Sequence, residues 1–294
     1  MILRFAIGLA LVAGGALVSA QGPMLPSYPK LAFGASITPA YDGWWDNPDG
    51  SHTYLMGYYS RNWEASLDIP VGPNNHFEPG EPDRGQPTHF LPNRNFGMFT
   101  VTLPKEHPAM ERLWWVITAN GVTQRIPMHR SPDYNIQPMQ ASEESPGGRY
   151  NSPAMLKFAE KDPWIQGPVA NLQHAFARTA MVNQPLTLDM WVADDALYTS
   201  GTNAPLLKTP KLVELAVNKY RGPGKVTVGK GHEEITTLKG GKTDERFEGK
   251  TSTTVTFSDP GDYVVHVTAN DLSGPGGGSS GCCWTTAMVK VAVK

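Results

Sequence analysis

Apolar and polar residues alternate with a period of two along most of the chain, and this pattern predicts β-strands. The segment from Ser51 to Trp63 carries apolar side chains on both alternating faces. A strand with two apolar faces is covered on both sides, so a central strand is predicted there. Further predicted strands cover residues 95–103, 113–119, 122–128, 184–192, 211–219, 225–228, 253–257, 262–268 and 284–293. Residues 211–219 also suit a helix, because Leu and Ala are good helix formers, but their alternation favours a strand.

No sustained helical period follows the first twenty residues, so the predicted fold class is all-β. The chain holds 30 Gly and 26 Pro beside a 40% hydrophobic fraction, which is typical of many short strands joined by tight turns. Asn120-Gly121 predicts a hairpin, because both positions tolerate positive φ. The segment from Asp46 to Gly50 predicts a Pro-Asp-Gly turn. A calcium loop is the other interpretation, but its glycine stands at the fifth position and no matching Glu closes the loop.

The N-terminus has the order of a secretory signal peptide. One positive charge at Arg4 precedes an uncharged apolar run from Phe5 to Val18, and the small residues Ser19 and Ala20 follow. This order predicts a signal peptide over residues 1–20, cleaved near Ala20. The apolar run is too short for a comfortable membrane span, and no later stretch is suited to one. We therefore expect an exported protein, periplasmic, at the cell surface or extracellular, with no membrane span in the mature chain.

Composition sets the expected partners and domain count. The chain has 25 basic and 27 acidic residues, a formal net charge of −2, and loss of Arg4 with the signal peptide makes it −3. A near-neutral chain gives no electrostatic reason to expect nucleic acid as a partner. A mature chain of about 270 residues exceeds most single cores, so two domains are predicted. The polar, Pro- and Gly-containing stretch in the middle is the expected linker, which gives domains 21–137 and 153–294 joined by residues 138–152.

A family resemblance supports the second domain. The stretch TTVTFSDPGDYVVHVTAND, followed by WTTAMVKVAVK, resembles the closing strands of PKD-type and immunoglobulin-like β-sandwiches of bacterial secreted proteins. The positions on that pattern are Pro260, Gly261, Tyr263, Val265, Val267, Ala269 and Asp271. The resemblance covers about residues 153–294 and implies a sandwich, while it says almost nothing about function. The first half, on the stretches LMGYYSRNWEASLDIPVGPNN and DRGQPTHFLPNRN, resembles exported bacterial proteins that carry such a sandwich at the C-terminus. The expected architecture is two immunoglobulin-like β-sandwich domains in tandem after a signal peptide.

The resemblance to immunoglobulin-like sandwiches suggests a structural role for one tyrosine. Tyr263 stands two residues after Gly261, the last residue of the corner Ser258-Asp259-Pro260-Gly261. A tyrosine at this place in a sandwich can bond its hydroxyl back to the corner backbone. We therefore expect Tyr263 to brace the corner.

Aromatic residues are concentrated in one part of the first domain. They are Trp44, Trp45, Tyr54, Tyr58, Tyr59 and Trp63. Filling of the core is the favoured interpretation, because a strand-rich domain needs large side chains. If several faced solvent, they could instead form a stacking platform for sugar rings, and Trp44, Trp45 and Tyr58 are the candidate binding residues on that hypothesis. Trp284, beside the cysteine pair, is a further candidate.

Histidines and a polar loop are the other candidates for chemistry. Four histidines of the first domain that lie in or beside predicted loops, His76, His89, His107 and His129, show no H-x-H or H-x-x-x-H spacing. A metal site needs converging ligands, so neither a metal nor another cofactor is predicted. The stretch from Asp83 to His89 is dense in hydrogen-bonding groups and makes Arg84 and His89 candidate binding residues. The other interpretation is that Asp83 and Arg84 only pin the loop.

Signatures of hydrolases are missing from the sequence. There is no G-x-S-x-G elbow, H-E-x-x-H motif or P-loop. A crowd of carboxylates, Glu64, Asp68, Glu78, Glu81 and Asp83, leaves a glycosidase-like pair open. The predicted function is therefore a non-catalytic exported protein that binds a glycan or protein partner at the cell envelope or outside the cell. The alternative is an envelope enzyme or metal-binding protein that uses loop histidines and carboxylates of the first domain.

The only two cysteines, Cys282 and Cys283, are adjacent. Export implies an oxidising environment. Neighbouring Cα atoms lie about 3.8 Å apart, closer than the usual disulfide span, so a bridge between these residues requires an irregular turn. The glycine run Gly276-Gly277-Gly278 permits one. We predict a vicinal disulfide, with intermolecular bridging and a reactive or copper-binding thiol pair as alternatives.

Overall fold

The computed structural model describes residues 31–139, 151–195, 212–240, 246–271 and 283–294. Within them the fold is all-β, as the alternation predicted. The strands are β1 (Ile37–Asp46), β2 (His52–Ser60), β3 (Leu67–Asp68), β4 (Asn75–Glu78), β5 (His89–Phe90), β6 (Asn93–Leu103), β7 (Leu113–Ala119), β8 (Val122–Met128), β9 (Met155–Lys157), β10 (Phe176–Ala180), β11 (Leu186–Asp194), β12 (Val213–Arg221), β13 (Val226–Val228), β14 (Thr236–Lys239), β15 (Phe247–Phe257), β16 (Gly261–Asp271) and β17 (Trp284–Val293), with short 3-10 helices η1 (Pro132–Tyr134) and η2 (Lys230–Glu233).

The first half of the described chain packs two three-stranded sheets face to face. One sheet has the order β1-β2-β6 and the other β4-β7-β8, while β3 and β5 form a separate pair. Eight of the nine residues of β2 are buried, and its partners β1 and β6 flank it on either side. The predicted central strand with two covered faces is therefore confirmed.

The second half packs two larger sheets around a core of its own. The order is β10-β17-β16-β12 in one sheet and β13-β15-β11-β9 in the other, with β14 also paired to β15. Alternate residues of β16 and β17, among them Val265, Val267 and Val289, fill the space between the sheets. Since Val213–Arg221 is a strand paired to β16, the helix alternative for this segment is wrong.

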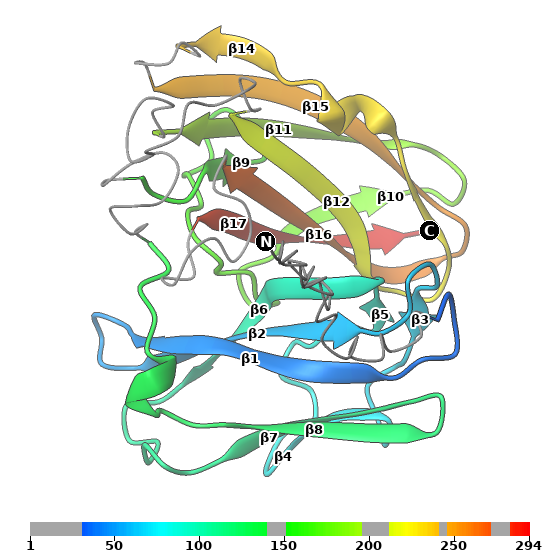
Figure 1. Cartoon of the computed structure of the whole chain (residues 1–294). Coiled ribbons are helices and arrows are strands. Elements are labelled where there is room, and N and C mark those ends of the chain that lie inside the picture. Colours follow the sequence, from blue (N-terminus) through cyan, green and yellow to red (C-terminus); the bar gives the residue numbers. More distant parts are fainter. Residues whose placement is uncertain (1–30, 140–150, 196–211, 241–245, 272–282) are drawn as a thin grey trace, which may run out of the picture. The chain divides into compact units, whose positions relative to one another are not determined.

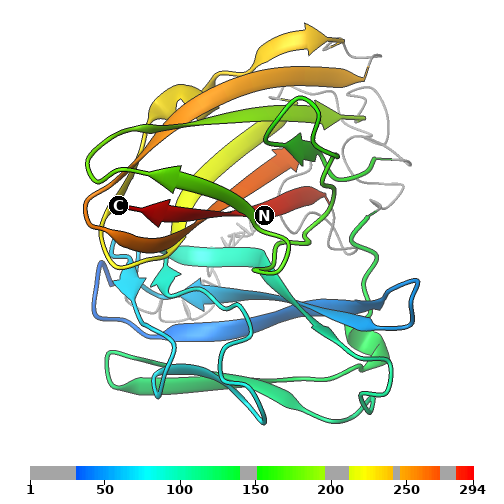
Figure 2. The ribbon, with the colours of Figure 1, turned by 180° about the vertical axis from the view of Figure 1, so that it is seen from behind.

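The four sheets lie on one another as layers within residues Leu31–Lys294, which form a single compact unit (Figures 1 and 2). The sheet β1-β2-β6 lies between the sheet β4-β7-β8 and the sheet β10-β17-β16-β12. Residues 1–20 and most of the expected linker are outside the described residues. The signal peptide and the division into two immunoglobulin-like domains therefore stay predictions.

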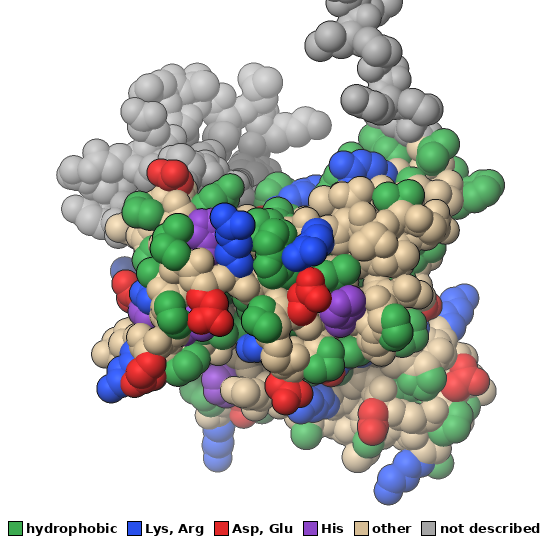
Figure 3. Space-filling view, turned by 90° about the horizontal axis from the view of Figure 1, so that it is seen from below, with side chains coloured by type: hydrophobic (Ala, Val, Ile, Leu, Met, Phe, Trp, Pro, Cys, Tyr) green, Lys and Arg blue, Asp and Glu red, His purple; other side chains and the backbone are tan. Residues whose placement is uncertain are grey.

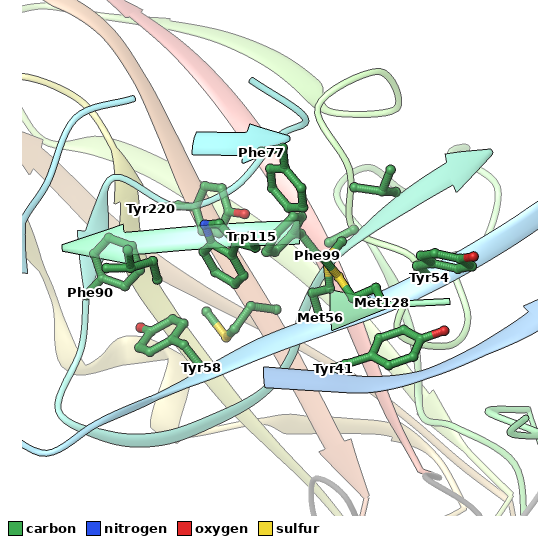
Figure 4. Packing of buried hydrophobic residues seen from close by; sticks show 14 of the residues in the cluster. Tyr41, Tyr54, Met56, Tyr58, Phe77, Phe90, Phe99, Trp115, Met128 and Tyr220 are labelled. Carbon is green, nitrogen blue, oxygen red and sulfur yellow. The ribbon is translucent and has the colours of Figure 1, made fainter. Parts of the chain in front are cut away.

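The core of the first half is aromatic and is centred on Trp115 (Figure 4). Its indole ring stacks on Phe77, with centroids 5.7 Å apart and planes 9° apart, and meets Phe99 edge-on at 5.2 Å. Tyr54 and Tyr58 also belong to this cluster and are fully buried. Core filling was the favoured interpretation of these two tyrosines, and their burial agrees with it.

The outer face of the sheet β4-β7-β8 carries mixed charges. Figure 3 shows acidic, basic and histidine side chains interspersed with hydrophobic ones on the side of the molecule where this sheet lies. Arg125 stacks on Trp114, with its guanidinium carbon 3.9 Å from the ring centroid, and pairs with Glu78 at 3.4 Å. The cation covers the ring of Trp114, so this ring is not a bare stacking surface.

Two predicted turns are present. Asn120 and Gly121 have φ values of 50° and 77° and join β7 to β8 as a tight hairpin. The segment between β1 and β2 is also a turn, in which the Gly50 amide donates to the Asn47 carbonyl and the Asn47 amide to the Ser51 carbonyl. The Pro-Asp-Gly interpretation of this segment is therefore confirmed.

The predicted tyrosine brace is also confirmed. The Tyr263 hydroxyl donates to the Asp259 carbonyl and accepts from the Gly224 amide, both at 2.9 Å. Tyr263 itself is 1% exposed. One hydroxyl thereby ties the corner before β16 to the turn before β13.

We expect Tyr263→Phe to lower the free energy of unfolding by about 1–2 kcal/mol, because two hydrogen bonds are lost and the Gly224 amide loses its acceptor. Urea unfolding followed by tryptophan fluorescence measures the change. Tyr59→Phe, at a tyrosine that is 38% exposed, is the matched control. If both variants lose the same stability, the brace does not contribute.

Candidate functional site

The two adjacent tryptophans of β1 lie on opposite faces of their sheet. Consecutive strand residues point to opposite sides. Trp44 packs against the aromatic core and donates its Nε1–H to the Ser131 carbonyl at 2.8 Å. Trp45 instead lines a cavity on the other face. Of the two, only Trp45 is therefore placed to meet a ligand.

A row of side chains extends from Trp45 across the sheet. Trp45 pairs with Thr53 of β2, and Thr53 pairs with Thr102 of β6. The two threonine Oγ1 atoms lie 3.2 Å apart, and Asn47 Nδ2 donates to Thr53 Oγ1 at 2.8 Å. Directly opposed residues share a face, so one aromatic ring and two hydroxyl groups are presented together.

The cavity beside this row has a volume of about 550 Å³. Both halves of the described chain line it. The residues are Trp45, Asn47, Asp49, Ser51, Thr53, Thr100, Thr102, Ile165, Val169, Ala170, Asn171, His174, Phe176, Thr286, Ala287 and Met288. Ligand pockets of about 300–1,000 Å³ with apolar walls and a few polar groups are typical of small-molecule sites.

A carboxylate stands at the turn between β1 and β2. Asp49 Oδ1 accepts hydrogen bonds from the Ser51 hydroxyl at 2.6 Å and the Ser51 amide at 3.0 Å. These bonds hold the pKa of Asp49 below its ordinary value. Asp49 is therefore ionised at neutral pH, and its second oxygen, which has no partner among the described residues, can accept hydrogen bonds.

The opposite wall supplies a fixed donor. Asn171 Oδ1 accepts from the backbone amides of Gln173 and His174, both at 3.0 Å, so its Nδ2 must donate. That Nδ2 lies 3.1 Å from His174 Nδ1. Neutral His174 then accepts at Nδ1 and carries its hydrogen on Nε2. The exposed histidine therefore presents an N–H donor at the cavity.

The segment that carries Asn171 and His174 is anchored to both halves. The Thr100 amide donates to the Ala170 carbonyl at 2.9 Å, and the Ala170 amide donates to Thr286 Oγ1 at 3.0 Å. The Gly167 amide likewise donates to Thr285 Oγ1 at 2.8 Å. These bonds connect the segment to β6 and to β17, so the cavity wall is held by the backbone.

Two sequence candidates are not accessible as stacking groups. Tyr58 is fully buried, and its hydroxyl accepts from the Leu91 amide at 2.8 Å. Trp284 is 1% exposed and lies against Gly97 of β6, where an added Cβ would come within 2.4 Å of the indole. Gly97 also has a φ of 49°. Both rings are packing groups, and we do not include them in the site.

His89 and Lys219 meet at one carboxylate. His89 Nδ1 lies 2.9 Å from Asp68 Oδ1, and Lys219 Nζ lies 3.0 Å from the same oxygen. Burial opposes ionisation of Asp68, but the hydrogen bonds from His89 and Lys219 outweigh it and lower the pKa. The three residues connect strands β3 and β5 to β12. His89 therefore acts here as one member of a contact between the two halves.

The loop that holds Arg84 is pinned in a similar way. Asp83 receives two hydrogen bonds from Arg221, at 2.9 and 2.7 Å, and these lower its pKa. Gln86 is fully buried and accepts from the Arg84 amide at 2.8 Å. Arg84 itself contacts the Pro79 carbonyl at 3.4 Å, and burial lowers the pKa of its guanidinium. The geometry agrees with the loop-pinning interpretation of Asp83.

The residues of the enzyme alternative can now be placed. A glycosidase acid needs a raised pKa, whereas the pKa values of Asp68 and Asp83 are lowered. A second cavity, of about 400 Å³, has Asp68 as its single ionisable lining residue. In the described ranges, no three His, Cys, Asp or Glu side chains gather as metal ligands. The histidines His76, His107 and His129 therefore belong to no such group among these residues.

Cys283 is fully buried, with Sγ 3.8 Å from the Asn151 carbonyl oxygen. The structure records no free thiol among its described cysteines. Cys282, however, is outside the described residues, so the vicinal disulfide between Cys282 and Cys283 stays a prediction.

Sequence reasoning identified Trp45 but missed Asn171 and His174. The segment from Ile165 to Phe176 has no periodic pattern, and nothing in it signals contact with the β1–β2 turn. The Asn171 side chain bonds to amides two and three residues ahead, which is the local signature of a turn-forming Asn. That signature predicts the turn, but it does not predict which other part of the chain the turn lies against.

Comparison with known proteins adds little to this geometry. No protein-family model matches the sequence, and a search of curated proteins finds no match. Among solved structures, the chain is similar to one described as the crystal structure of the S-layer protein SbsC domains 4 and 5. The identity is 9%, with 88% of this chain and 98% of that chain covered, and the TM-score is 0.23. A TM-score this low carries no argument about fold or function.

Proposed function

We propose that this protein is a non-catalytic exported binding protein whose ligand is a sugar unit of a glycan, held in the cavity at Trp45. The observation that carries the proposal is the composition of that cavity. One aromatic ring stands in a row with two threonine hydroxyls, and a carboxylate and a histidine N–H lie at the same cavity. Sugars present an apolar C–H face and a ring of hydroxyl groups, and this lining offers a partner for each.

The charge of the lining favours a neutral sugar. Its fixed charge is one carboxylate, Asp49, and its remaining polar groups are hydroxyls, amides and His174. A carboxylate oxygen accepts from a sugar hydroxyl, while His174 Nε2–H donates to one. Hydrogen bonds to a charged acceptor are stronger than neutral ones, so Asp49 should set the orientation of the sugar above Trp45.

The concave form favours a glycan over a protein partner. A cavity of about 550 Å³ accommodates a small ligand, whereas stable protein interfaces need about 800 Å² of surface on each partner. The enzyme alternative has less support. Two of its five candidate carboxylates, Asp68 and Asp83, are each held ionised by a cation of β12, and a third, Glu78, pairs with Arg125.

We expect Trp45→Ala to weaken binding of a neutral oligosaccharide at least tenfold, equivalent to about 1.4 kcal/mol, because the stacking surface is lost. Soluble oligomers of glucose, mannose, galactose and N-acetylglucosamine are the probes. Isothermal titration calorimetry measures the affinity, and quenching of tryptophan fluorescence reports contact with the ring.

Trp63→Ala is the matched control, because Trp63 is 43% exposed and lies outside the cavity lining. It should leave the affinity unchanged. Failure of every oligosaccharide to bind, or equal binding by the Trp45 variant and its parent, would overturn the proposal.

Export is part of the same proposal. The charged, apolar and small-residue order of residues 1–20 supports it. Among the described residues, no helix is long and apolar enough to cross a membrane. N-terminal sequencing of the mature protein, produced with its own leader, should give Gln21 as the first residue. We also keep the division near residues 138–152 into two immunoglobulin-like halves as a proposal, supported by the hydrophobic cluster that is formed by residues of the second half alone.

A further inference from the structure

The two walls of the Trp45 cavity differ in polarity. The first half of the chain contributes Trp45 and six polar residues. Of the nine lining residues from the second half, six are apolar, among them Val169, Ala170 and Met288. Ala170 and Met288 are buried, and Val169 is half-buried. A ligand in this cavity therefore meets polar groups on one side and mainly hydrocarbon on the other.

Most polar atoms of the second-half wall are already used by the protein. Thr286 Oγ1 accepts from the Ala170 amide at 3.0 Å. Asn171 Oδ1 accepts from two backbone amides. Its Nδ2 lies 3.3 Å from the Val169 carbonyl oxygen and 3.1 Å from His174 Nδ1, so both amide hydrogens are used. His174 is exposed, and its Nε2–H is the donor that this wall offers to a ligand.

A donor beside an apolar wall suits an acceptor that carries no hydrogen of its own. A sugar hydroxyl can accept from His174, but its own hydrogen then needs an acceptor that hydrocarbon does not provide, and an unpaired polar group costs free energy. A carbonyl oxygen accepts without that cost. An acetyl group places a carbonyl oxygen and a methyl group on one carbon atom, and burial of the methyl group against hydrocarbon is favourable.

We propose that the sugar unit bound at Trp45 is an N-acetylated amino sugar of the N-acetylglucosamine type. This inference rests on the proposed function and names the class of sugar. The acetyl carbonyl accepts from His174 Nε2–H, and the methyl group lies against the apolar wall at Val169 and Met288. The amide N–H of the sugar donates to the opposite wall, where Asp49 supplies acceptor oxygens. The acetamido group is neutral, which agrees with the small fixed charge of the lining.

The test is calorimetric titration of the mature protein with two trimers of the same linkage, one of N-acetylglucosamine and one of glucose. They differ only in the acetamido or hydroxyl group on each ring. The N-acetylglucosamine trimer should bind about tenfold more tightly, because it gains a hydrogen bond and a buried methyl group. The glucosamine trimer, which keeps the nitrogen but lacks the acetyl group, should not reach that affinity.

Two variants test the two contacts of the acetyl group. His174→Ala removes the donor, and Val169→Thr places a hydroxyl in the apolar wall. Each should reduce the preference for the N-acetylglucosamine trimer from about tenfold to about threefold, while the affinity for the glucose trimer changes little. His232→Ala and Val122→Thr, at positions outside the cavity lining, are the matched controls and should keep the preference of the parent.

Equal affinity for the N-acetylglucosamine and glucose trimers would overturn this inference and leave the glycan proposal standing. Equally tight binding of the glucosamine trimer would also overturn it, because attraction of an ammonium group to Asp49 would then replace recognition of the acetyl group. A preference unchanged in both the His174 and the Val169 variant would have the same consequence. Failure of every oligosaccharide to bind would overturn both proposals, so the two failures are distinguishable.

Discussion

Replacing Trp115 with alanine is expected to lower the free energy of unfolding by about 4 kcal/mol. Trp115 is fully buried and contacts three aromatic rings, Phe77, Phe90 and Phe99. Truncation removes the transfer free energy of the indole and leaves a cavity that rings on three sides cannot easily fill. Urea unfolding monitored by far-ultraviolet circular dichroism measures the loss without relying on the removed fluorophore.

The indole also carries a buried polar group. Trp115 Nε1–H donates to Asn75 Oδ1 at 3.0 Å, and Asn75 Nδ2 donates to the carbonyls of Ile69 and Pro87. Trp115→Phe keeps most of the ring volume but leaves the fully buried Asn75 Oδ1 without its donor. We expect this variant to lose about 1–3 kcal/mol, less than the alanine variant.

Trp164→Ala is the matched control, because Trp164 is 37% exposed. Surface substitutions usually change stability by no more than about 0.5 kcal/mol. If Trp115→Ala lost no more stability than Trp164→Ala, Trp115 would not be the centre of this core.

Local patterns predicted the parts of the fold that local chemistry determines. Asn120-Gly121 specified a hairpin because its two positions adopt positive φ, and the Pro-Gly corner with Tyr263 specified a brace because the hydroxyl reaches a carbonyl four residues back. Strand β2 was predictable as a central strand because both of its faces are apolar. In each case, the residues that determine the element are neighbours in the sequence.

Strand β1 was missed for an identifiable reason. It contains Pro39 and Gly43, residues that interrupt a strand pattern. The structure accommodates them with a register shift between Tyr41 and Gly43. Sheet pairing with β2 thus overrides the local preference, and pairing is not visible in a single segment.

The candidate site was predictable only in part. The aromatic concentration identified Trp45, but the choice between Trp44 and Trp45 depends on which face of β1 meets the core. His174 gains its surroundings from strands far away in the sequence, β1, β2 and β6. Such convergence follows from the packing of the sheets, which alternation within one strand does not specify.

Acidification from about pH 6.5 to about pH 4 is expected to destabilise the protein through His266. This residue of β16 is 1% exposed, stacks on Tyr220 at 5.5 Å and lies with Nε2 2.8 Å from the Met98 carbonyl of β6. Burial lowers its pKa from 6.5 to about 4, although the hydrogen bond to Met98 acts in the opposite direction. The folded protein therefore keeps His266 neutral, with the hydrogen on Nε2.

The direction of the stability change follows from the pKa of His266 in the unfolded chain, 6.5, and in the folded protein, about 4. Above about pH 6.5, His266 is neutral in both states and contributes no pH dependence. Between 6.5 and about 4 the unfolded chain binds a proton that the folded protein does not, so stability falls as the pH falls. The full loss is about 3 kcal/mol. Asp68 and Asp83, whose pKa values are lowered in the folded protein, change the stability only below this pH window. Their contribution to stability is fully present above their ordinary pKa of 3.8.

Urea unfolding at several pH values from 7.5 to 4 measures this effect, and His266→Gln should flatten it. Glutamine retains a donor for the Met98 carbonyl but does not titrate, so the variant should lose most of the about 3 kcal/mol dependence while still folding. His174→Gln, at an exposed histidine, should keep the slope of the parent. An unchanged slope in the His266 variant would assign the acid sensitivity to other groups. A flattened slope would show that the contact between β6 and β16, which joins the two halves of the chain, depends on a neutral imidazole.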